Sequence, residues 1–258
     1  MSEPTVAEIS RTIASASLSE LPSLLERYAR DTRSGVVAAL ASARRRMERD
    51  DAECKRLDRM AELQATLHES GVMVVAGVDE VGRGCLAGPV TAGAVILPVT
   101  ARITGIDDSK RLKPVTRVQL DAEIRTVAHA VAVAHVEPSV IDAIGIAPAN
   151  LLAMRRAVES LGVEVEHVLI DGLPVDVGRP STAVVGGDRL VSAIAAASIV
   201  AKVARDALMR EMDAQFPEYG FALNKGYGTL EHIEVIARIG PCKLHRMSFS
   251  PCSQVTLF

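Results

Sequence analysis

The strongest constraint on the fold is an uninterrupted apolar run that ends in two adjacent carboxylates. Residues 72–78 read Val-Met-Val-Val-Ala-Gly-Val, and Asp79 and Glu80 follow directly. A continuous apolar run of this length is typical of a strand that is buried on both faces. Two adjacent carboxylates at its end repel one another unless a positive charge lies beside them. The segment therefore predicts a buried strand that ends at a cation-binding position.

Strand and helix patterns alternate along the rest of the chain. Apolar runs typical of strands cover residues 90–97, 130–136, 165–170 and 182–185, and helical spacing covers residues 114–124, 151–161 and 191–212. This alternation predicts an α/β fold, in which functional residues gather at strand ends. We expect the main domain to span residues 67–258.

Residues 1–66 are expected to form a helical extension. Thr5 and Glu8 match a capping box. Between Arg44 and Arg59, twelve of sixteen residues are charged, which suits a solvated helix better than a core element. The mixed charge leaves three roles open for the extension, namely binding a partner, gripping a duplex or contributing solubility.

Composition excludes several classes of protein. The chain has 258 residues, 48% hydrophobic and 24% charged, as in ordinary globular proteins rather than disordered or fibrous ones. The four cysteines are far apart and form no C-x-x-C pair, so neither a zinc site nor a disulfide framework is expected. Glycines and prolines interrupt the uncharged residues 84–101, which argues against a membrane span. No secretory signal is recognised, and we expect a cytoplasmic monomer.

The net charge of -3 offers no broad attraction for phosphate backbones. A nucleic-acid site on this chain would therefore be a local basic patch or a cleft that depends on metal ions.

Carboxylates follow two further predicted strands. Asp171 ends the strand of residues 165–170, and Asp188 follows that of residues 182–185. Together with Asp79 and Glu80 they could meet in one cleft. Oxygen-only ligands select Mg²⁺ or Mn²⁺ over zinc. An aspartate at a strand end can also simply begin a turn, and this alternative applies better to each residue alone than to the group.

Two glycine-rich loops accompany these acids. Gly82-Arg83-Gly84 lets a ligand approach the backbone, which also allows a dinucleotide-binding interpretation. That alternative is disfavoured because Asp79 and Glu80 would repel a pyrophosphate. In the second loop, Tyr227 lies between two glycines and can stack on a sugar or a base, the alternative being a hairpin with a buried tyrosine.

Taken together, the motifs resemble a known family, bacterial ribonuclease HII, a type 2 ribonuclease H. The matching segments are residues 77–84, 86–90, 108–110, 170–172, 187–188, 196–203 with 205–206, 225–229 with 232, and 245–246 with 248–249, in family order. The helical extension also resembles one found in some members. The chain departs from the family pattern at Gly186, where members commonly carry lysine.

The resemblance implies an RNase H-like mixed sheet flanked by helices. It also implies an endonuclease that cuts the RNA strand of RNA–DNA hybrids and cuts 5′ of ribonucleotides embedded in duplex DNA. Two divalent ions would support phosphodiester hydrolysis to 3′-hydroxyl and 5′-phosphate ends, in ribonucleotide removal during DNA replication and repair. The metal ligands and catalytic residues carried over are Asp79, Glu80, Asp171 and Asp188.

Substrate contacts are implied in the same way. Gly82, Arg83 and Gly84 would contact the 2′-hydroxyl region of the ribonucleotide, and Tyr227 would stack on the neighbouring deoxyribose. Five further residues would hold phosphates: Ser109, Lys110, Asn224, Lys225 and Thr229.

The last residues resemble the Gln-x-x-Leu-Phe peptide by which bacterial repair proteins dock on the sliding clamp. Gln254, Leu257 and Phe258 would make this contact, the alternative being a frayed terminus.

Other polar residues of the matching segments receive structural interpretations. Lys202, Arg205 and Asp206 are expected to form a salt-bridged helix face rather than to take part in catalysis. His232 and His245 are expected to be structural or to contact phosphates. Two functions of other classes remain as alternatives, a nicotinamide-dependent oxidoreductase and a non-catalytic nucleic-acid-binding protein.

Overall fold

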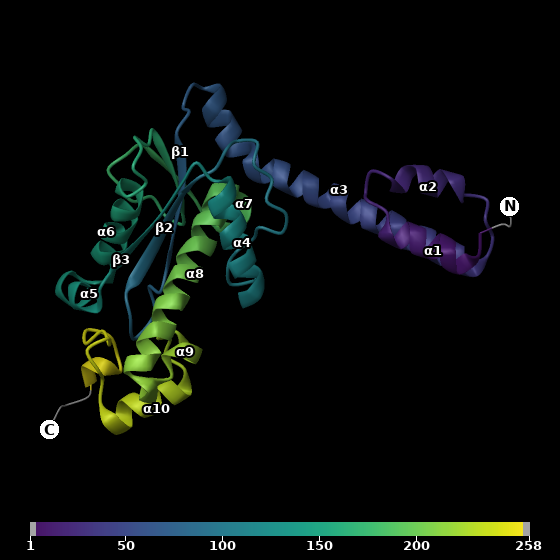
Figure 1. Cartoon of the computed structure of the whole chain (residues 1–258). Coiled ribbons are helices and arrows are strands. Elements are labelled where there is room, and N and C mark those ends of the chain that lie inside the picture. The colour runs from purple at the N-terminus through teal and green to yellow at the C-terminus, as the bar shows by residue number, and fades with distance from the viewer. Residues whose placement is uncertain (1–3, 255–258) are drawn as a thin grey trace. The chain divides into compact units, whose positions relative to one another are not determined.

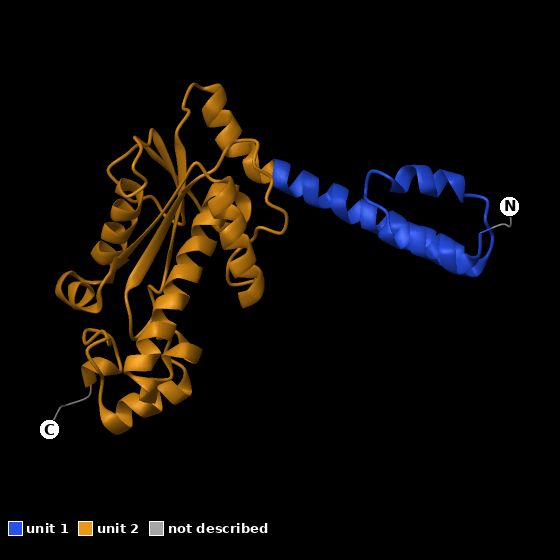
Figure 2. Cartoon of the chain, viewed as in Figure 1, with its two compact units in different colours: residues 1–58 blue, residues 59–258 orange. Residues whose placement is uncertain are grey.

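The computed structural model describes residues 4–254. The chain divides into two compact units, Met1–Asp58 and Arg59–Phe258, which Figure 2 colours separately. Helix α3, Ser34–Glu69, runs through both the division at residue 58 and the predicted boundary at residue 66.

The first unit is helical, as predicted. It contains α1 (Val6–Ser15), α2 (Leu21–Arg27) and most of α3. The predicted capping box is present at the start of α1, where the Thr5 N–H donates to the Glu8 carboxylate at 2.7 Å and the Thr5 hydroxyl accepts from the Glu8 N–H. The unit has its own small core, formed by Ile9, Ile13, Leu21, Val36, Leu40 and Ala43.

The second unit is built on a mixed five-stranded sheet, which confirms the predicted fold class (Figure 1). Its strands are β1 (Val75–Val81), β2 (Val90–Ile96), β3 (Ala130–Val136), β4 (His167–Asp171) and β5 (Ser181–Val184). They lie in the order β3-β2-β1-β4-β5. Strand β2 is antiparallel to β1 and β3, whereas β4 is parallel to β1 and β5.

Strand β1 begins three residues later than predicted and contains both acids within it. The preceding segment does not pair as a strand because the Glu166 carboxylate accepts from the N–H groups of Met73 and Val74, at 2.5 and 3.0 Å. Asp79 lies opposite Gly93 of β2 in the sheet. The acid pair is therefore fixed by strand pairing rather than placed in a loop.

The remaining elements surround this sheet. They are α4 (Pro114–Val127), α5 (Pro138–Ile144), α6 (Ile146–Glu159), α7 (Gly187–Leu190), α8 (Ser192–Gln215), α9 (Phe221–Asn224) and α10 (Leu230–Ile239), with 3-10 turns η1 (Pro217–Tyr219) and η2 (Cys252–Gln254). Figure 1 shows α6 on one face of the sheet and α8 on the other. No helix in residues 4–254 is long and apolar enough to cross a membrane.

Two glycines in the strands let α8 approach the sheet at backbone distance. A Cβ atom on Gly77 would lie 2.2 Å from the carbonyl carbon of Ala193, and one on Gly93 would lie 2.4 Å from the Ala197 oxygen. On the α6 face, alanines and branched residues of the strands pack against Ala153 and Met154 in the main core. The close contact with α8 places that helix directly beside the acidic part of β1.

Candidate active site

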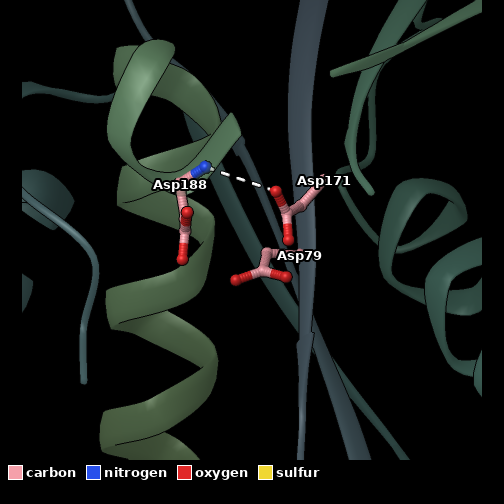
Figure 3. A group of neighbouring side chains, drawn as sticks. All are labelled: Asp79, Asp171 and Asp188. Atoms are coloured by element: carbon pink, nitrogen blue, oxygen red, sulfur yellow. Dashed lines mark hydrogen bonds between the residues drawn. The ribbon is translucent and has the colours of Figure 1, made fainter. Parts of the chain in front are cut away.

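Three aspartates from separate segments meet near the C-terminal ends of the parallel strands β1 and β4 (Figure 3). Asp79 lies in β1, Asp171 is the last residue of the neighbouring parallel strand β4, and Asp188 lies in the short helix α7. One carboxylate oxygen from each lies within 4.8 Å of the others. The Asp188 N–H donates to Asp171 Oδ1 at 3.4 Å, which ties α7 to the strand end. The structure thus brings together three of the four predicted carboxylates.

The fourth predicted carboxylate, Glu80, lies outside this group of three. Successive side chains of a strand point to opposite faces, so Glu80 and Asp79 leave β1 in different directions. The Glu80 N–H donates to Asp79 Oδ1 at 2.7 Å, and its carboxylate lies 3.8 Å from the Arg83 guanidinium.

Burial dominates the electrostatics of these acids. Asp79 is only 4% exposed, and burial together with the charge of Glu80 raises its pKa to about 8. Burial also raises the pKa of Asp188, with Asp108 and Asp171 adding repulsion. For Glu80, burial raises the pKa, and the charge of Arg83 partly opposes this shift.

The donor set fits a hard divalent cation. All three ligand atoms are carboxylate oxygens, the type preferred by Mg²⁺ and Mn²⁺. The raised pKa of Asp79 shows that its negative charge is poorly compensated by the chain itself. A bound cation would supply this compensation.

Two polar residues that sequence analysis did not assign to the site support these acids. The Ser198 hydroxyl of α8 hydrogen-bonds the Asp79 carboxylate and lowers its pKa, against the effect of burial. The Asn150 side chain of α6 acts in the same way on Glu80. Both lie on the buried faces of their helices. A polar residue on an otherwise apolar helix face is the signal that could have identified them.

Ser109, predicted to hold a phosphate, is almost fully buried. The residue is 3% exposed, and its hydroxyl lies 2.9 Å from the Ser198 hydroxyl. Lys110 beside it is exposed, and its charge lowers the pKa of both Glu80 and Asp188, so this cation stands near the carboxylates.

A buried arginine holds the backbone of the loop of Gly82, Arg83 and Gly84. Arg246 is fully buried and donates to the carbonyl oxygens of Gly82 at 2.6 Å and Arg83 at 2.8 Å. Gly82 has a φ of +83°, whereas a Cβ atom on Gly84 would meet nothing within 4 Å. The Arg83 side chain is mostly exposed. This loop therefore has a fixed backbone and an open outer face.

Tyr227 is partly exposed beside two cations. Its ring centroid lies 5.6 Å from Lys202 Nζ and 5.9 Å from the Arg205 guanidinium carbon, and burial raises the pKa of its hydroxyl to about 12. Lys202 pairs with Asp206 at 2.7 Å, as expected of a salt-bridged helix. The same expectation is wrong for Arg205, which is fully buried and donates to the carbonyl oxygens of Pro89 and Lys225.

The side chains around Tyr227 build the loop itself. Asn224 donates to the Tyr219 carbonyl oxygen and accepts from the Gly226 N–H. Thr229 caps α10 by accepting from the His232 N–H, and Lys225 Nζ donates to the Ala222 carbonyl oxygen. Their phosphate contacts stay predictions.

The predicted clamp-binding residues lie at the end of the chain. Gln254 is the last residue of η2. Leu257 and Phe258 lie outside the described residues.

Comparison with known proteins gives two family matches. Residues 76–252, more than half of the chain, match the family model of ribonuclease HII, and residues 5–68 match the ribonuclease HII N-terminal domain.

Solved structures of related proteins share the fold. The ribonuclease H2 from Pyrococcus horikoshii OT3 is 25% identical with a TM-score of 0.62, over 70% of this chain and 96% of that chain. The RNase HII in a PCNA:RNase HII complex from Archaeoglobus fulgidus is 27% identical with a TM-score of 0.58, over 69% and 96%. Bst-RNase HIII in complex with Mn²⁺, at 20% identity, a TM-score of 0.58 and coverage of 72% and 70%, shares the fold alone.

The expected family is therefore confirmed by the match over the sheet, the acids and both loops. The chain belongs to the ribonuclease HII family and is a metal-dependent ribonuclease H, a hydrolase of the RNA strand of RNA–DNA hybrids.

Proposed function

We propose that this ribonuclease H also cuts duplex DNA on the 5′ side of a single embedded ribonucleotide, leaving 3′-hydroxyl and 5′-phosphate ends. The observation that supports this proposal is the meeting of Asp79, Asp171 and Asp188 close to the Arg83 loop. Arg83 is paired with Glu80, the neighbour of Asp79, so a ribose beside this loop would have its phosphate near the acids.

Asp79, Asp171 and Asp188, with Glu80 at the side, are the residues that would hold two Mg²⁺ or Mn²⁺ ions. Such ions, when bound, supply the charge that activates a water molecule and stabilises the departing 3′ oxygen. The chain itself orients Asp79 through Ser198 and Glu80 through Asn150.

Recognition of the ribonucleotide is assigned to the chain's own loops. The open space at Gly84 allows the backbone to approach the 2′-hydroxyl, the group that distinguishes RNA from DNA. The exposed part of the Tyr227 ring would stack on the deoxyribose next to it, as predicted from the sequence.

A duplex with one ribonucleotide tests this function. In the presence of Mg²⁺ or Mn²⁺, we expect one cut 5′ of the ribonucleotide and no cut in the all-DNA duplex. Asp79→Asn removes a buried carboxylate with little change in volume and should abolish the cut. Asp51→Asn, at an exposed position on α3, is the matched control and should cut normally. Cleavage by Asp79→Asn at the wild-type rate would refute the role of Asp79.

A sliding clamp is the proposed partner of the tail. The Gln-x-x-Leu-Phe pattern of residues 254–258 supports this partner, as does the complex of the Archaeoglobus fulgidus relative with PCNA. A variant that lacks residues 254–258 should cut short duplexes normally and lose clamp binding. Unchanged clamp affinity of this variant would exclude the tail as the docking segment.

A further inference from the structure

Two buried histidines form a hydrogen-bonded chain that ends at the backbone of Tyr227. His232 Nε2 and His245 Nε2 lie 3.0 Å apart, and His232 Nδ1 lies 2.8 Å from the Tyr227 carbonyl oxygen. At the other end, the Cys242 N–H donates to His245 Nδ1 at 3.0 Å. The two side chains come from α10 and from the segment that follows it. They are 0% and 2% exposed.

The fixed partners at both ends determine where the protons lie. A carbonyl oxygen only accepts, so His232 must carry its proton on Nδ1 and accept at Nε2. His232 Nε2 then needs a donor, which a neutral His245 ring supplies from its own Nε2. His245 Nδ1 is therefore the acceptor of the Cys242 N–H at 3.0 Å and not a donor to the Cys242 carbonyl oxygen, which lies 3.3 Å away. The result is one directed chain, from Cys242 through His245 and His232 to Tyr227. It requires both rings to be neutral.

The surroundings keep the two rings neutral. Burial lowers the pKa of His245 to about 4, with the proximity of His232 adding to the effect, and burial lowers the pKa of His232 as well. Tyr219 and Phe221 pack against the rings, with centroids 4.8 Å from His245 and 5.6 Å from His232 respectively. Neither aromatic ring offers a negative charge that would favour protonation.

The histidine chain is one of several contacts that hold the backbone at Tyr227, whose own N–H donates to the Asn224 carbonyl oxygen at 2.9 Å. Tyr227 lies between Gly226 and Gly228, and glycines leave the chain conformationally free. The Gly226 carbonyl oxygen is held by the Leu86 N–H at 2.8 Å. One residue later, the Tyr227 carbonyl oxygen accepts from His232 and from the Thr229 N–H. The histidine chain thus adds a side-chain contact at the residue whose ring is partly exposed.

We propose that His232 and His245 are positioning residues, which fix Tyr227 for recognition of the deoxyribose next to a single ribonucleotide. This inference rests on the proposed function and adds to it a determinant of substrate choice. In a long hybrid the sugar at that place is a ribose. The histidines should therefore influence the ratio between the two kcat/KM values, that for the single-ribonucleotide duplex and that for the long hybrid.

Matched substitutions distinguish the contributions of the hydrogen bonds made by the two ring nitrogens. An asparagine amide nitrogen takes about the place of Nδ1, and a glutamine amide nitrogen takes about the place of Nε2. His232→Asn should retain the bond to Tyr227 and keep the ratio near wild type. His232→Gln loses that bond, and the ratio should fall about fivefold, as expected for one buried hydrogen bond.

The effects of asparagine and glutamine on the ratio should be reversed at His245, because this residue donates from Nε2 whereas His232 donates from Nδ1. His245→Gln should keep the ratio, and His245→Asn should lower it. The melting temperature of each variant is measured, and the assays run well below the lowest one. A purely structural role would change stability and both substrates together, without this reversal. If one variant is unfolded, the pair at the other histidine still carries the test.

Tyr227→Ala provides the reference for the whole series. It should lower the ratio by itself, and His232→Gln should add nothing in that background. If Tyr227→Ala lowers the ratio but the reversal is absent, the histidine chain is refuted and the function of Tyr227 stands. If Tyr227→Ala leaves the ratio unchanged, both the positioning role of the histidines and the role of Tyr227 in recognition are refuted. Failure of the wild type to cut the single-ribonucleotide duplex would instead refute the proposed function.

Discussion

Asp79 shows that the folding and the chemistry of this chain place opposite demands on one residue. The carboxylate is almost fully buried, and its pKa is raised to about 8, mainly by burial and by the charge of Glu80. A group whose pKa is higher in the folded than in the unfolded state contributes stability at low pH. This contribution is lost as the pH rises through the folded pKa. The metal-free protein should therefore lose stability as the pH rises from about 4 to about 8, with no further loss from this group above that.

Asp79→Asn should remove this loss. The neutral amide retains an oxygen that can accept from Ser198 but carries no charge. At pH 9 without metal, we expect the variant to exceed wild type in the free energy of unfolding by more than about 1 kcal/mol, the equivalent of roughly one pKa unit. Adding Mg²⁺ should stabilise the wild type and not the variant. Denaturant titrations at pH 6 and pH 9, with and without Mg²⁺, measure both effects, and equal stabilities at pH 9 would contradict them.

His245 should give the opposite pH dependence. Its pKa is lowered by burial to about 4, from the ordinary value of 6.5. The unfolded chain therefore binds more protons than the folded one in this interval. Stability is fully present above about pH 6.5 and is lost as the pH falls toward 4. A shift of this size corresponds to roughly 3 kcal/mol.

The variant His245→Gln isolates this contribution from that of the carboxylates. The free energy of unfolding of the wild type should fall more steeply between pH 6.5 and 4 than that of the variant, which has no ring to protonate. Parallel curves for the two proteins would show that folding does not lower the pKa of this ring.

At the scale of the elements, the close contact between α8 and the sheet positions the site. A Cβ atom on Gly77 would overlap the backbone of Ala193, so Gly77→Ala must push the helix away from β1. We expect this variant to lose about 3 kcal/mol of unfolding free energy. Thermal unfolding measures the loss. Gly84→Ala is the matched control, since that position is open, and its melting temperature should equal that of the wild type.

Most strands and helices were predictable because their signals are local. The runs at residues 130–136 and 90–97 predicted β3 and β2 to within one residue. The start of β1 was missed because Glu166, far away in the sequence, binds the backbone of the preceding segment. Such a pairing leaves no pattern in a single sequence.

The acids of the site were predictable for a similar reason, since each ends or follows an apolar run. The buried arginines were not. Arg205 and Arg246 are held by backbone carbonyl oxygens of distant segments, and a carbonyl oxygen occurs at every residue regardless of its type. The amino-acid sequence therefore carries no signature of these hydrogen bonds, although the two arginines fix the backbone of both loops.

At the scale of the whole molecule, the second unit contains the sheet, its cores and all described residues of the site. The first unit has a core of its own. The match to a separate N-terminal domain covers residues 5–68 and so also includes residues 59–68 of the second unit. The second unit begins at Arg59 and so retains the last part of α3. This part includes Gln64, whose buried side chain donates to the Leu97 carbonyl oxygen. A chain of residues 59–258 should therefore fold and unfold in one cooperative transition.

This truncated chain also distinguishes the roles left open for the first unit. Since no acid or loop residue of the site is removed, we expect kcat on the single-ribonucleotide duplex to stay within about threefold of the full chain, a difference below 1 kcal/mol in activation free energy. If the basic residues of α3 grip the duplex, KM should rise for the truncated chain and depend less steeply on salt. An unchanged KM would exclude that role, and a large loss of kcat would show that the first unit is needed to form the site.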